Sequence, residues 1–444
     1  MLALPGMKVK AQYPPKYSLQ QCLDFAVNNS YAAHRANLDI REAAHQVQEA
    51  RSGVLPRINA SGSIDKNLVL PTMMLPGEII GQSGTQIPVQ MGTKNALEFS
   101  ATVEQVIFEP SLFTGIKIAR NNRELQRLRA TMTKEEIIFD VSYAFYDILN
   151  SMQELDNINY MITRQDSLSL LIRKRVEENI TREVDLNRIM VNLTNLRARG
   201  ENIKNTLLQQ KRYLQILMGM PVGDILELED SEAKHIEVSG WQTSPALQNQ
   251  VETDILNKQK EILGLDIQLG KMGYLPTLSA IASAGYQFQA DKLNLAKEPW
   301  FSSVLVGVRL SIPIFDGFNK RSQLKQKQTQ LQRLDWDITE AQQRVFLNYQ
   351  NAKDQLQVIY RQVQVQSENL QLAEKVYTQT MALYNEGLAT ITDLLETETS
   401  SREAKMGYTT ELIRYKKTEI DLLKASGTLE YLLKNNFQLS INEL

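Results

Sequence analysis

The chain has 444 residues, of which 43% are apolar and 23% are charged, a composition typical of a folded globular protein rather than a disordered one. The formal net charge of -2 excludes both the basic field of a nucleic-acid binder and the acidic excess of a solvating tail. A single cysteine, Cys22, excludes a disulfide framework and a cysteine-rich metal site.

Residues 1–16 are interpreted as a residual leader or N-terminal extension, because Val9 and Ala11 form a small-residue pair of the kind that precedes signal cleavage. Cys22 follows Leu19 at the spacing of a lipoprotein signal, but glutamines fill the small-residue positions between them. We therefore expect Cys22 to be buried in a helix. No stretch approaches the apolar length of a transmembrane helix, which leaves the strands of a β-barrel as a route into a membrane.

Two long tracts, residues 111–220 and 314–444, contain no proline. Proline inside a helix costs about 3 kcal/mol, so its absence favours long helices. In the second tract apolar residues recur at every seventh position from Leu324 to Ile359, which predicts a left-handed coiled-coil seam. The predicted long helices span residues 111–178, 183–217, 316–385 and 390–426.

Segments with partial period-two alternation of apolar and polar residues precede each helical tract, and this pattern is typical of strands. The predicted strands span residues 54–65, 97–108, 274–289 and 300–313. The connection between the first two, residues 66–96, is rich in glycine and proline and is predicted to be a surface loop.

The two halves of the chain share the same landmarks. "GVLPRI" in the first half matches "GYLPTL" in the second, and Asp185 and Asp393 are separated by the same number of residues as Gly219 and Gly427. This correspondence predicts an internal duplication in which each repeat runs helix, strand, strand, long helix, turn, helix. The repeats span residues 17–230 and 246–430, with a linker or equatorial segment at 231–245 and a C-terminal extension at 431–444.

Four strands cannot close a barrel, and an open four-stranded sheet would expose two edges to aggregation. Strands of the predicted lengths can cross a bilayer when they are tilted, provided that the barrel closes. Closure therefore requires several chains, and these arguments leave their number open.

The duplicated plan, the opening "YSLQQCLDFAVNNS", the "LP" strand starts and the G-x5-D-x2-[DE] turn together resemble the TolC family of outer-membrane efflux and secretion channels. The resemblance implies a mainly α-helical homotrimer in which four strands per chain contribute to a 12-stranded membrane β-barrel, continued by a long coiled-coil α-helical barrel. It implies a location in the Gram-negative outer membrane, extending into the periplasm. The implied partners are a periplasmic adaptor (membrane fusion) protein, an inner-membrane transporter and outer-membrane lipid, with no nucleic acid.

Each long helix is followed by a turn and a returning helix. Gly387 and Asn179 are residue types that adopt the left-handed conformation that ends a helix. Asp393 and Asp185 then fall near the N-terminus of the returning helix, where the helix dipole favours a carboxylate. From the residues alone, a role in stabilising the helix start and a role in the channel both stay open.

The resemblance adds specific roles. Asp393 and Glu396 match the acidic channel constriction of the family, and Tyr384 and Asp185 match its tip latch. An arginine that the family pattern places near Ala389 is absent, and Arg182 or Arg188 is the substitute that we consider. Adaptor docking is expected at the two tip turns, which comprise Asn179, Ile180, Thr181, Gly387, Leu388 and Ala389.

The function that we predict is a passive trimeric export duct, gated at its periplasmic tip, in a tripartite efflux or type I secretion system. The alternative is a soluble periplasmic coiled-coil scaffold or adaptor protein. No nucleophile and base can be placed together, so no enzymatic activity is expected. The three histidines are scattered, so neither a metal site nor a cofactor is expected. The cargo stays open between drugs, metal ions and proteins.

Overall fold

The computed structural model describes residues 16–76, 78, 81, 84, 86–229, 250–295 and 297–433. Most of the predicted leader, the whole equatorial segment with His235, and residues 434–444 of the C-terminal extension lie outside these ranges. The chain forms two compact units. The first comprises Met1–Ile40, Gln126–Asn257 and Trp336–Leu444, and the second comprises Arg41–Leu125 and Lys258–Asp335.

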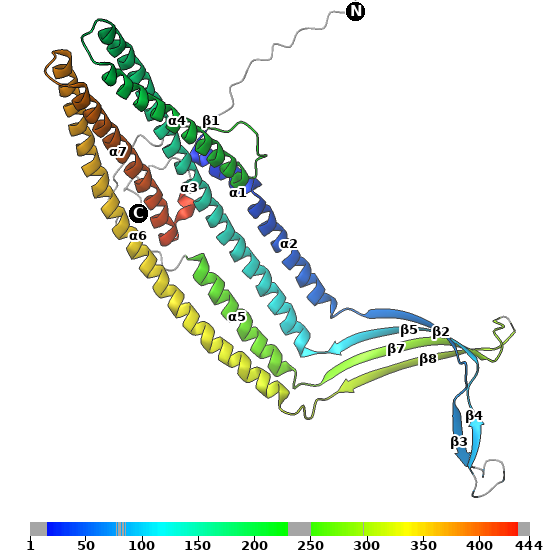
Figure 1. Cartoon of the computed structure of the whole chain (residues 1–444). Coiled ribbons are helices and arrows are strands. Elements are labelled where there is room, and N and C mark those ends of the chain that lie inside the picture. The colour runs from blue at the N-terminus through cyan, green and yellow to red at the C-terminus, as the bar shows by residue number, and fades with distance from the viewer. Residues whose placement is uncertain are drawn as a thin grey trace, which may run out of the picture. The chain divides into compact units, whose positions relative to one another are not determined.

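Helices build the first unit (Figure 1). It contains α1 (Leu19–Asn29), α4 (Glu183–Met218), α7 (Ile391–Ser426) and the short 3-10 helix η3 (Leu429–Leu433). Four further helices belong in part to each unit, namely α2 (Tyr31–Ser52), α3 (Pro110–Glu177), α5 (Val251–Met272) and α6 (Asn319–Asn385). The short strands β1 (Lys16–Tyr17) and β6 (Glu227–Leu228) pair in parallel. None of the helices in the described part of the chain has the length and apolar content that crossing a membrane requires.

Local sequence signals set the ends of these helices. Ser18 and Gln21 form a capping box at the start of α1, with a hydrogen bond in each direction. Helices α4 and α7 both end at a glycine in the left-handed conformation, Gly219 and Gly427. A Cβ at Gly219 would lie 2.2 Å from the carbonyl oxygen of Asn29, so this helix end also requires the smallest residue for packing.

Two apolar clusters hold the helices of the first unit together. One surrounds Phe145 and Leu149 of α3 and includes residues of α1, α4, α7 and η3. Cys22 lies fully buried in it, which confirms the expected helical, buried cysteine. The other cluster joins α6 to α7 around Tyr415 and contains Ile359 of the seven-residue seam. This packing confirms the seam as a buried face of α6.

An antiparallel four-stranded sheet forms the second unit, with the strand order β2-β5-β7-β8. Its strands are β2 (Arg57–Lys66), β5 (Asn95–Phe108), β7 (Thr277–Ala290) and β8 (Trp300–Ser311). All four predicted strands are confirmed, but β2 and β7 begin three residues later than predicted, after Pro56 and Pro276. Proline has no N–H for the ladder, so each strand starts at the residue that follows it.

The predicted surface loop at residues 66–96 is wrong in part, because it contains an antiparallel hairpin of β3 (Thr72–Pro76) and β4 (Gln86–Gln90). Met73 pairs with Val89 and Leu75 pairs with Ile87, so apolar side chains alternate on one face of the hairpin. The surrounding prolines and glycines hid this short alternation.

Helix α6 begins at Asn319 rather than at the predicted residue 316. Gly317 and Phe318 both have positive φ, at 67° and 65°, which is incompatible with a right-handed helix. The carboxylate of Asp316 accepts a hydrogen bond from the backbone N–H of Lys320 and so satisfies one donor of the first turn. At the other end of the chain, residues 431–433 belong to η3 instead of an extension.

The register of the sheet separates its residues into two chemically different faces. Directly opposite residues share a face, and the pairs Ile58 with Val103, Ala282 with Val306, and Leu278 with Leu310 all lie on the first one. This apolar face comprises Ile58, Ala60, Ile64, Leu97, Phe99, Ala101, Val103, Leu278, Ala280, Ala282, Ala284, Tyr286, Phe288, Trp300, Val304, Val306, Val308 and Leu310. The opposite face holds all the charged residues of the strands except Lys66, and most of the hydroxyl residues: Arg57, Asn59, Ser61, Ser63, Asp65, Glu98, Ser100, Thr102, Glu104, Ser279, Ser283, Gln287, Ser303, Arg309 and Ser311. It also carries a few large apolar residues, namely Val106, Ile281, Phe301 and Leu305.

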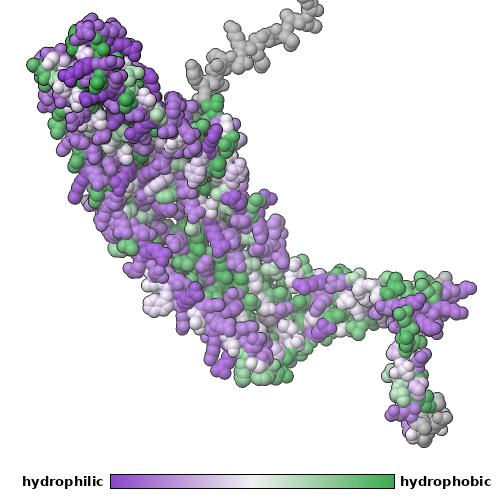
Figure 2. All heavy atoms as spheres, viewed as in Figure 1, coloured by the Kyte–Doolittle hydropathy of each residue, from purple (hydrophilic) through white to green (hydrophobic). Residues whose placement is uncertain are grey.

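Much of the apolar face is exposed in the single chain. Val306 is 80% exposed in the middle of β8, and its neighbours Val304 and Val308 are also exposed. Figure 2 shows hydrophobic residues on the strands and on the β3–β4 hairpin, whereas the helices of the first unit present a mostly hydrophilic surface. An apolar sheet surface of this kind indicates a nonaqueous environment or a partner.

Candidate functional site

The two turns that reverse the long helices have the same hydrogen-bond pattern. In the turn at residues 178–182, the N–H of Ile180 donates to the carbonyl oxygen of Arg175 at 2.8 Å. In the turn at 386–390, the N–H of Leu388 donates to the carbonyl oxygen of Leu383, also at 2.8 Å. These are the six-to-one bonds of a Schellman motif, which satisfies the last carbonyl groups of a helix. We call these two turns the tip turns.

The residue that closes each motif has a left-handed backbone. Asn179 has φ 58° and Gly387 has φ 77°, which confirms the conformations expected from the sequence. The next residue in each turn is a large apolar one that points into solvent, since Ile180 is 67% exposed and Leu388 is 73% exposed. The tip turns therefore present equivalent apolar side chains at equivalent positions.

Asp393 is part of a capping box at the start of α7. Its carboxylate accepts hydrogen bonds from the hydroxyl of Thr390 at 2.6 Å and from the backbone N–H of Thr390 at 2.9 Å. In return, the backbone N–H of Asp393 donates to the Thr390 hydroxyl. These bonds hold the pKa of the exposed Asp393 carboxyl below its usual range. The sequence interpretation missed Thr390, although "TITD" carries the spacing of a capping box.

Glu396 lies exposed on the same helix and takes no part in the capping box. Asp185 lies in the first turn of α4, where its backbone N–H donates to the carbonyl oxygen of Arg182. Both aspartates are therefore found at helix starts, as expected. Asp393 combines this helix-stabilising role with an exposed charge.

We call α3 with α4 the first helical hairpin, and α6 with α7 the second. An apolar cluster next to the tip turns contains residues of both hairpins. Tyr384 is buried in it together with Ile172 of α3, Ile189 of α4 and Leu394 of α7. The Arg175 guanidinium lies 5.4 Å from the centre of the Tyr384 ring, within the range of a cation–π contact. The structure thus places Tyr384, a predicted latch residue, at the contact between the hairpins.

Polar contacts also join the hairpins, and the sequence interpretation identified none of the pairings described next. Arg188 of α4 donates to the hydroxyl of Thr392 on α7 at 2.9 Å, so it is Arg188 that reaches the second hairpin at the tip. Gln165 of α3 donates to the carboxyl group of Glu398 on α7. The neighbouring Arg164 places its guanidinium 3.9 Å from the centre of the Tyr377 ring.

Burial distinguishes the Gln165 and Glu398 pair from a surface contact. Gln165 is 3% exposed and Glu398 is 6% exposed. Desolvation raises the pKa of Glu398, and the nearby Arg164 and Arg402 only partly oppose it. Burial also raises the pKa of Tyr377, so its hydroxyl stays protonated at neutral pH.

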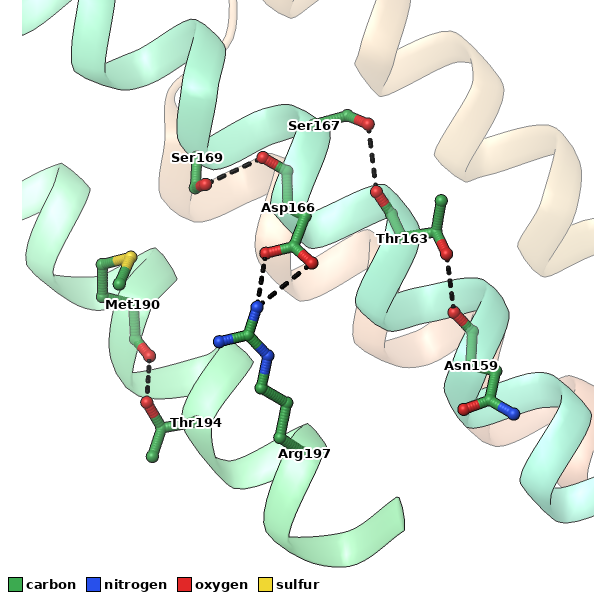
Figure 3. Close-up of polar contacts among 8 residues, drawn as sticks. All are labelled: Asn159, Thr163, Asp166, Ser167, Ser169, Met190, Thr194 and Arg197. Carbon is green, nitrogen blue, oxygen red and sulfur yellow. Dashed lines mark hydrogen bonds and ion pairs between the residues drawn. The ribbon is translucent and has the colours of Figure 1, made fainter. Parts of the chain in front are cut away.

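Within the first hairpin, an exposed ion pair links α3 to α4. One terminal nitrogen of Arg197 lies 2.9 Å and 3.2 Å from the two carboxylate oxygens of Asp166 (Figure 3). Figure 3 also shows the hydroxyls of Thr163 and Thr194 turned back to carbonyl oxygens of their own helices. These threonines use their hydroxyls inside their own helices rather than across the hairpin.

Part of the chain matches the model of a known protein family. Residues 264–428, which include β7, β8 and all of α6 and α7, match the family described as outer membrane efflux protein. The outer membrane protein TolC of Escherichia coli (strain K12) is 19% identical over 419 residues, covering 89% of this chain and 81% of that protein. TolC of Salmonella enteritidis is 19% identical over 350 residues, covering 76% of this chain and 70% of that protein.

By this match and these relatives, the chain is similar to the TolC family of outer-membrane efflux channels. The solved structure of the Campylobacter jejuni CmeC outer membrane channel covers 96% of this chain and 94% of its own, with a TM-score of 0.74 at 13% identity. That likeness shows the same mainly helical fold.

The function of this protein is that of an outer-membrane efflux channel, with a location in the outer membrane that extends into the periplasm. Its relatives are channel proteins rather than enzymes. The alternative of a soluble periplasmic scaffold is not favoured. Within the described ranges, no three His, Cys, Asp or Glu side chains gather closely enough to hold a metal ion.

Proposed function

We propose that three copies of this chain assemble into one export duct, in which each sheet contributes four strands to a 12-stranded membrane β-barrel. The observation that carries the proposal is the separation of the sheet into an apolar and a polar face. In a membrane barrel the apolar face contacts lipid and the polar face lines the water-filled interior.

Strand length and edge position fit this assembly. Strand β7 has 14 residues, which extend about 46 Å at roughly 3.3 Å per residue and cross a bilayer core when tilted by about 45°. Strands β2 and β8 lie at the two edges of the sheet, where pairing with neighbouring copies would satisfy their free backbone groups.

Aromatic residues lie near both ends of the sheet. Trp300 contacts Tyr286 at one end, with ring centroids 5.4 Å apart, and Phe315 contacts Phe318 beyond the other end, also at 5.4 Å. Aromatic girdles at both membrane interfaces are characteristic of barrels. We propose that these two groups mark the borders of the lipid.

The helical hairpins would continue the barrel as an α-helical tube built from two duplicated repeats, residues 17–230 and 246–430. The equal lengths of α4 and α7, at 36 residues each, and the matching Schellman motifs of the tip turns support the duplication. The tip turns would then form the periplasmic end of the duct.

At this end, Asp393 and Glu396 of three chains would form two acidic rings across the bore. Their exposure supports this role, and rings of carboxylates favour the passage of cations. Tyr384 and Asp185 would contribute to the latch that keeps the end closed. The exposed apolar residues of the tip turns, Ile180 and Leu388, support docking of a periplasmic adaptor protein that joins an inner-membrane transporter.

Fractionation, cross-linking and conductance test the proposal together. Detergent should be needed to extract the full chain, a short amine-reactive cross-linker should trap trimers, and the trimer should form discrete ion-conducting channels in planar bilayers. Extraction by buffer alone, or a cross-linked dimer or tetramer as the limiting species, would overturn the trimeric barrel.

A further inference from the structure

A groove that faces solvent lies between α3, α6 and α7. It has a volume of about 310 Å³. Its floor contains the buried side chains of Tyr377 and Glu398, and its rim contains the exposed Tyr160 and Lys405. Arg164 of α3 and Arg402 of α7 line it as well. We call it the arginine groove.

Cations outnumber usable anions in this groove. Arg164, Arg402 and Lys405 are its cations, whereas Glu374 and Glu398 are its acids. Glu398 is already bonded to Gln165, and its burial disfavours the charged form. Among the residues that the structure describes, no cation of the groove forms an ion pair with Glu374 or Glu398. The groove therefore keeps a net positive charge.

One donor in the groove is unused. Arg402 Nε is buried and has no hydrogen-bond partner among the residues that the structure describes. Its terminal nitrogen approaches Glu403, outside the groove, only at 3.9 Å. A buried N–H without an acceptor costs free energy, so a ligand oxygen at this position would be favourable.

Aromatic rings occupy two sides of the same space. The Arg164 guanidinium lies 3.9 Å from the centre of the Tyr377 ring and 5.8 Å from that of Tyr160. Lys405 Nζ lies 5.7 Å from the Tyr160 ring. Flat rings beside planar guanidinium groups favour a ligand that has a flat apolar body and a planar anionic group.

We propose that the arginine groove binds a small aromatic carboxylate, with the carboxylate between Arg164 and Arg402 and the ring beside Tyr160 and Tyr377. Lys405 at the rim adds attraction for the anion. The bound anion contacts α3 and α7 together, so it also ties the two helical hairpins to each other. Neither Asp393 nor Glu396 lines this groove, and the site does not depend on the trimeric barrel.

Isothermal titration of the full-length, detergent-solubilised protein with benzoate tests the proposal. We expect one site per chain with a dissociation constant on the order of 0.1 mM, a value typical of a ligand with few heavy atoms. Benzamide, which has the same shape without the charge, should bind at least about tenfold more weakly. Acetate and inorganic phosphate, which lack the ring, should also bind more weakly than benzoate.

Variants separate the groove from nonspecific attraction. Arg402→Gln and Lys405→Gln should each weaken benzoate binding, the former by about tenfold or more because it removes a charged donor. Arg197→Gln removes a cation that is paired with Asp166 outside the groove, and it should leave binding unchanged. Lys405 is exposed, so its variant tests the site even if Arg402→Gln fails to fold.

Three results would overturn the proposal. One is the absence of benzoate binding to the wild-type protein at 10-fold above the expected dissociation constant, that is, at about 1 mM. Another is equal binding by the wild type and Lys405→Gln. The third is benzamide or phosphate binding as tightly as benzoate, which would remove the need for the charge or the ring, respectively. None of these results bears on conductance, so the duct is tested separately.

Discussion

The side-chain amide of Gln165 on α3 donates a hydrogen bond to the carboxyl group of Glu398 on α7, and both groups are buried. This contact joins the two helical hairpins of the chain at a position where both side chains are largely shielded from water. A carboxyl group at such a position links the stability of the contact to pH.

The stability of the protein should therefore depend on the protonation of Glu398. Desolvation raises the pKa of Glu398, and the nearby Arg164 and Arg402 oppose this rise. Tyr377 of α6 also interacts electrostatically with Glu398. A carboxyl group with a raised folded-state pKa stabilises the fold fully below its unfolded pKa, and this contribution is lost as the pH rises through the folded value. We expect the melting temperature of the wild type, relative to Glu398→Gln, to fall as the pH rises from acid to neutral.

Thermal unfolding of the two proteins across this pH range measures the effect. Glu368→Gln, which changes an exposed carboxylate on α6, is the matched control and should follow the wild type. A constant difference in melting temperature between wild type and Glu398→Gln at every pH would contradict the prediction.

The two tip turns should respond differently to substitution of their left-handed residue. Gly387→Ala should lower the free energy of unfolding by about 1–2 kcal/mol, because an alanine pays the left-handed conformational cost. Asn179→Gly should stay within about 1 kcal/mol of the wild type, because both residues adopt this conformation. Urea unfolding compares the two variants, and no atom within 4 Å would meet the new Cβ at Gly387, so packing does not obscure the result. Equal losses in both variants would be inconsistent with a backbone cause.

Loss of the Arg188 contact should make the tip open more easily. Arg188→Gln shortens the side chain that donates to Thr392, a contact between hairpins that contributes about 0.5–1.5 kcal/mol. An equilibrium between closed and open tips would then shift by up to about tenfold. Mean conductance in planar bilayers measures this shift. Arg182→Gln is the control. Arg182 is the N-cap residue of α4, but its side chain makes no capping hydrogen bond, so this variant should leave conductance unchanged. Equal conductance in the wild type and Arg188→Gln would show that this contact does not hold the tip closed.

The acidic pair should set ion selectivity. The double variant Asp393→Asn with Glu396→Gln should lose most of its preference for potassium over chloride, measured as a reversal potential in a salt gradient. Glu396→Gln alone tests the charge without disturbing the capping box of α7. Thr390→Val removes a hydrogen bond that lowers the pKa of Asp393, so this variant should lose cation preference at a higher pH than the wild type during acidification. Unchanged selectivity in the double variant would exclude the acidic rings.

The two faces of the sheet should tolerate charge unequally. Val306→Arg places a charge in the middle of the apolar face and should cost about 2–4 kcal/mol in the membrane, with less trimer recovered in the outer membrane. Leu305→Arg is the adjacent substitution on the polar face, and at 59% exposure it should be tolerated. Recovery of trimers after mild detergent extraction compares the variants. Equal recovery would contradict the assignment of lipid-facing and interior faces.

Local patterns were sufficient to predict much of the fold. The absence of proline predicted the long helices, and Gly387 and Asn179 predicted the two reversals, because these properties depend on the backbone of a few neighbouring residues. The strand starts and the β3–β4 hairpin were less accessible. The strand starts depend on the exact position of a proline. The hairpin has only a short alternation of apolar residues, within a segment whose glycine and proline content is typical of a loop.

The contacts between hairpins were not accessible from spacing. Gln165 and Glu398 are separated by 233 positions, and Arg188 and Thr392 by 204. Nothing in the neighbourhood of Glu398 distinguishes it from the exposed Glu396, which lies two positions earlier. Its burial follows from which side of α7 packs against α3, and a helix of mixed polarity does not define that side by itself.

The sequence by itself determined the order of helices and strands, the two reversals with their acidic helix starts, and the resemblance to a channel family. Each depends on local backbone preferences or on the repetition of a pattern along the chain. Only the tertiary structure decided which carboxylate is buried, which arginine reaches the second hairpin, and that Arg164, Arg402 and two tyrosines line one groove. Such pairings depend on helix packing between residues that are far apart in the chain, and side-chain periodicity does not specify the partner.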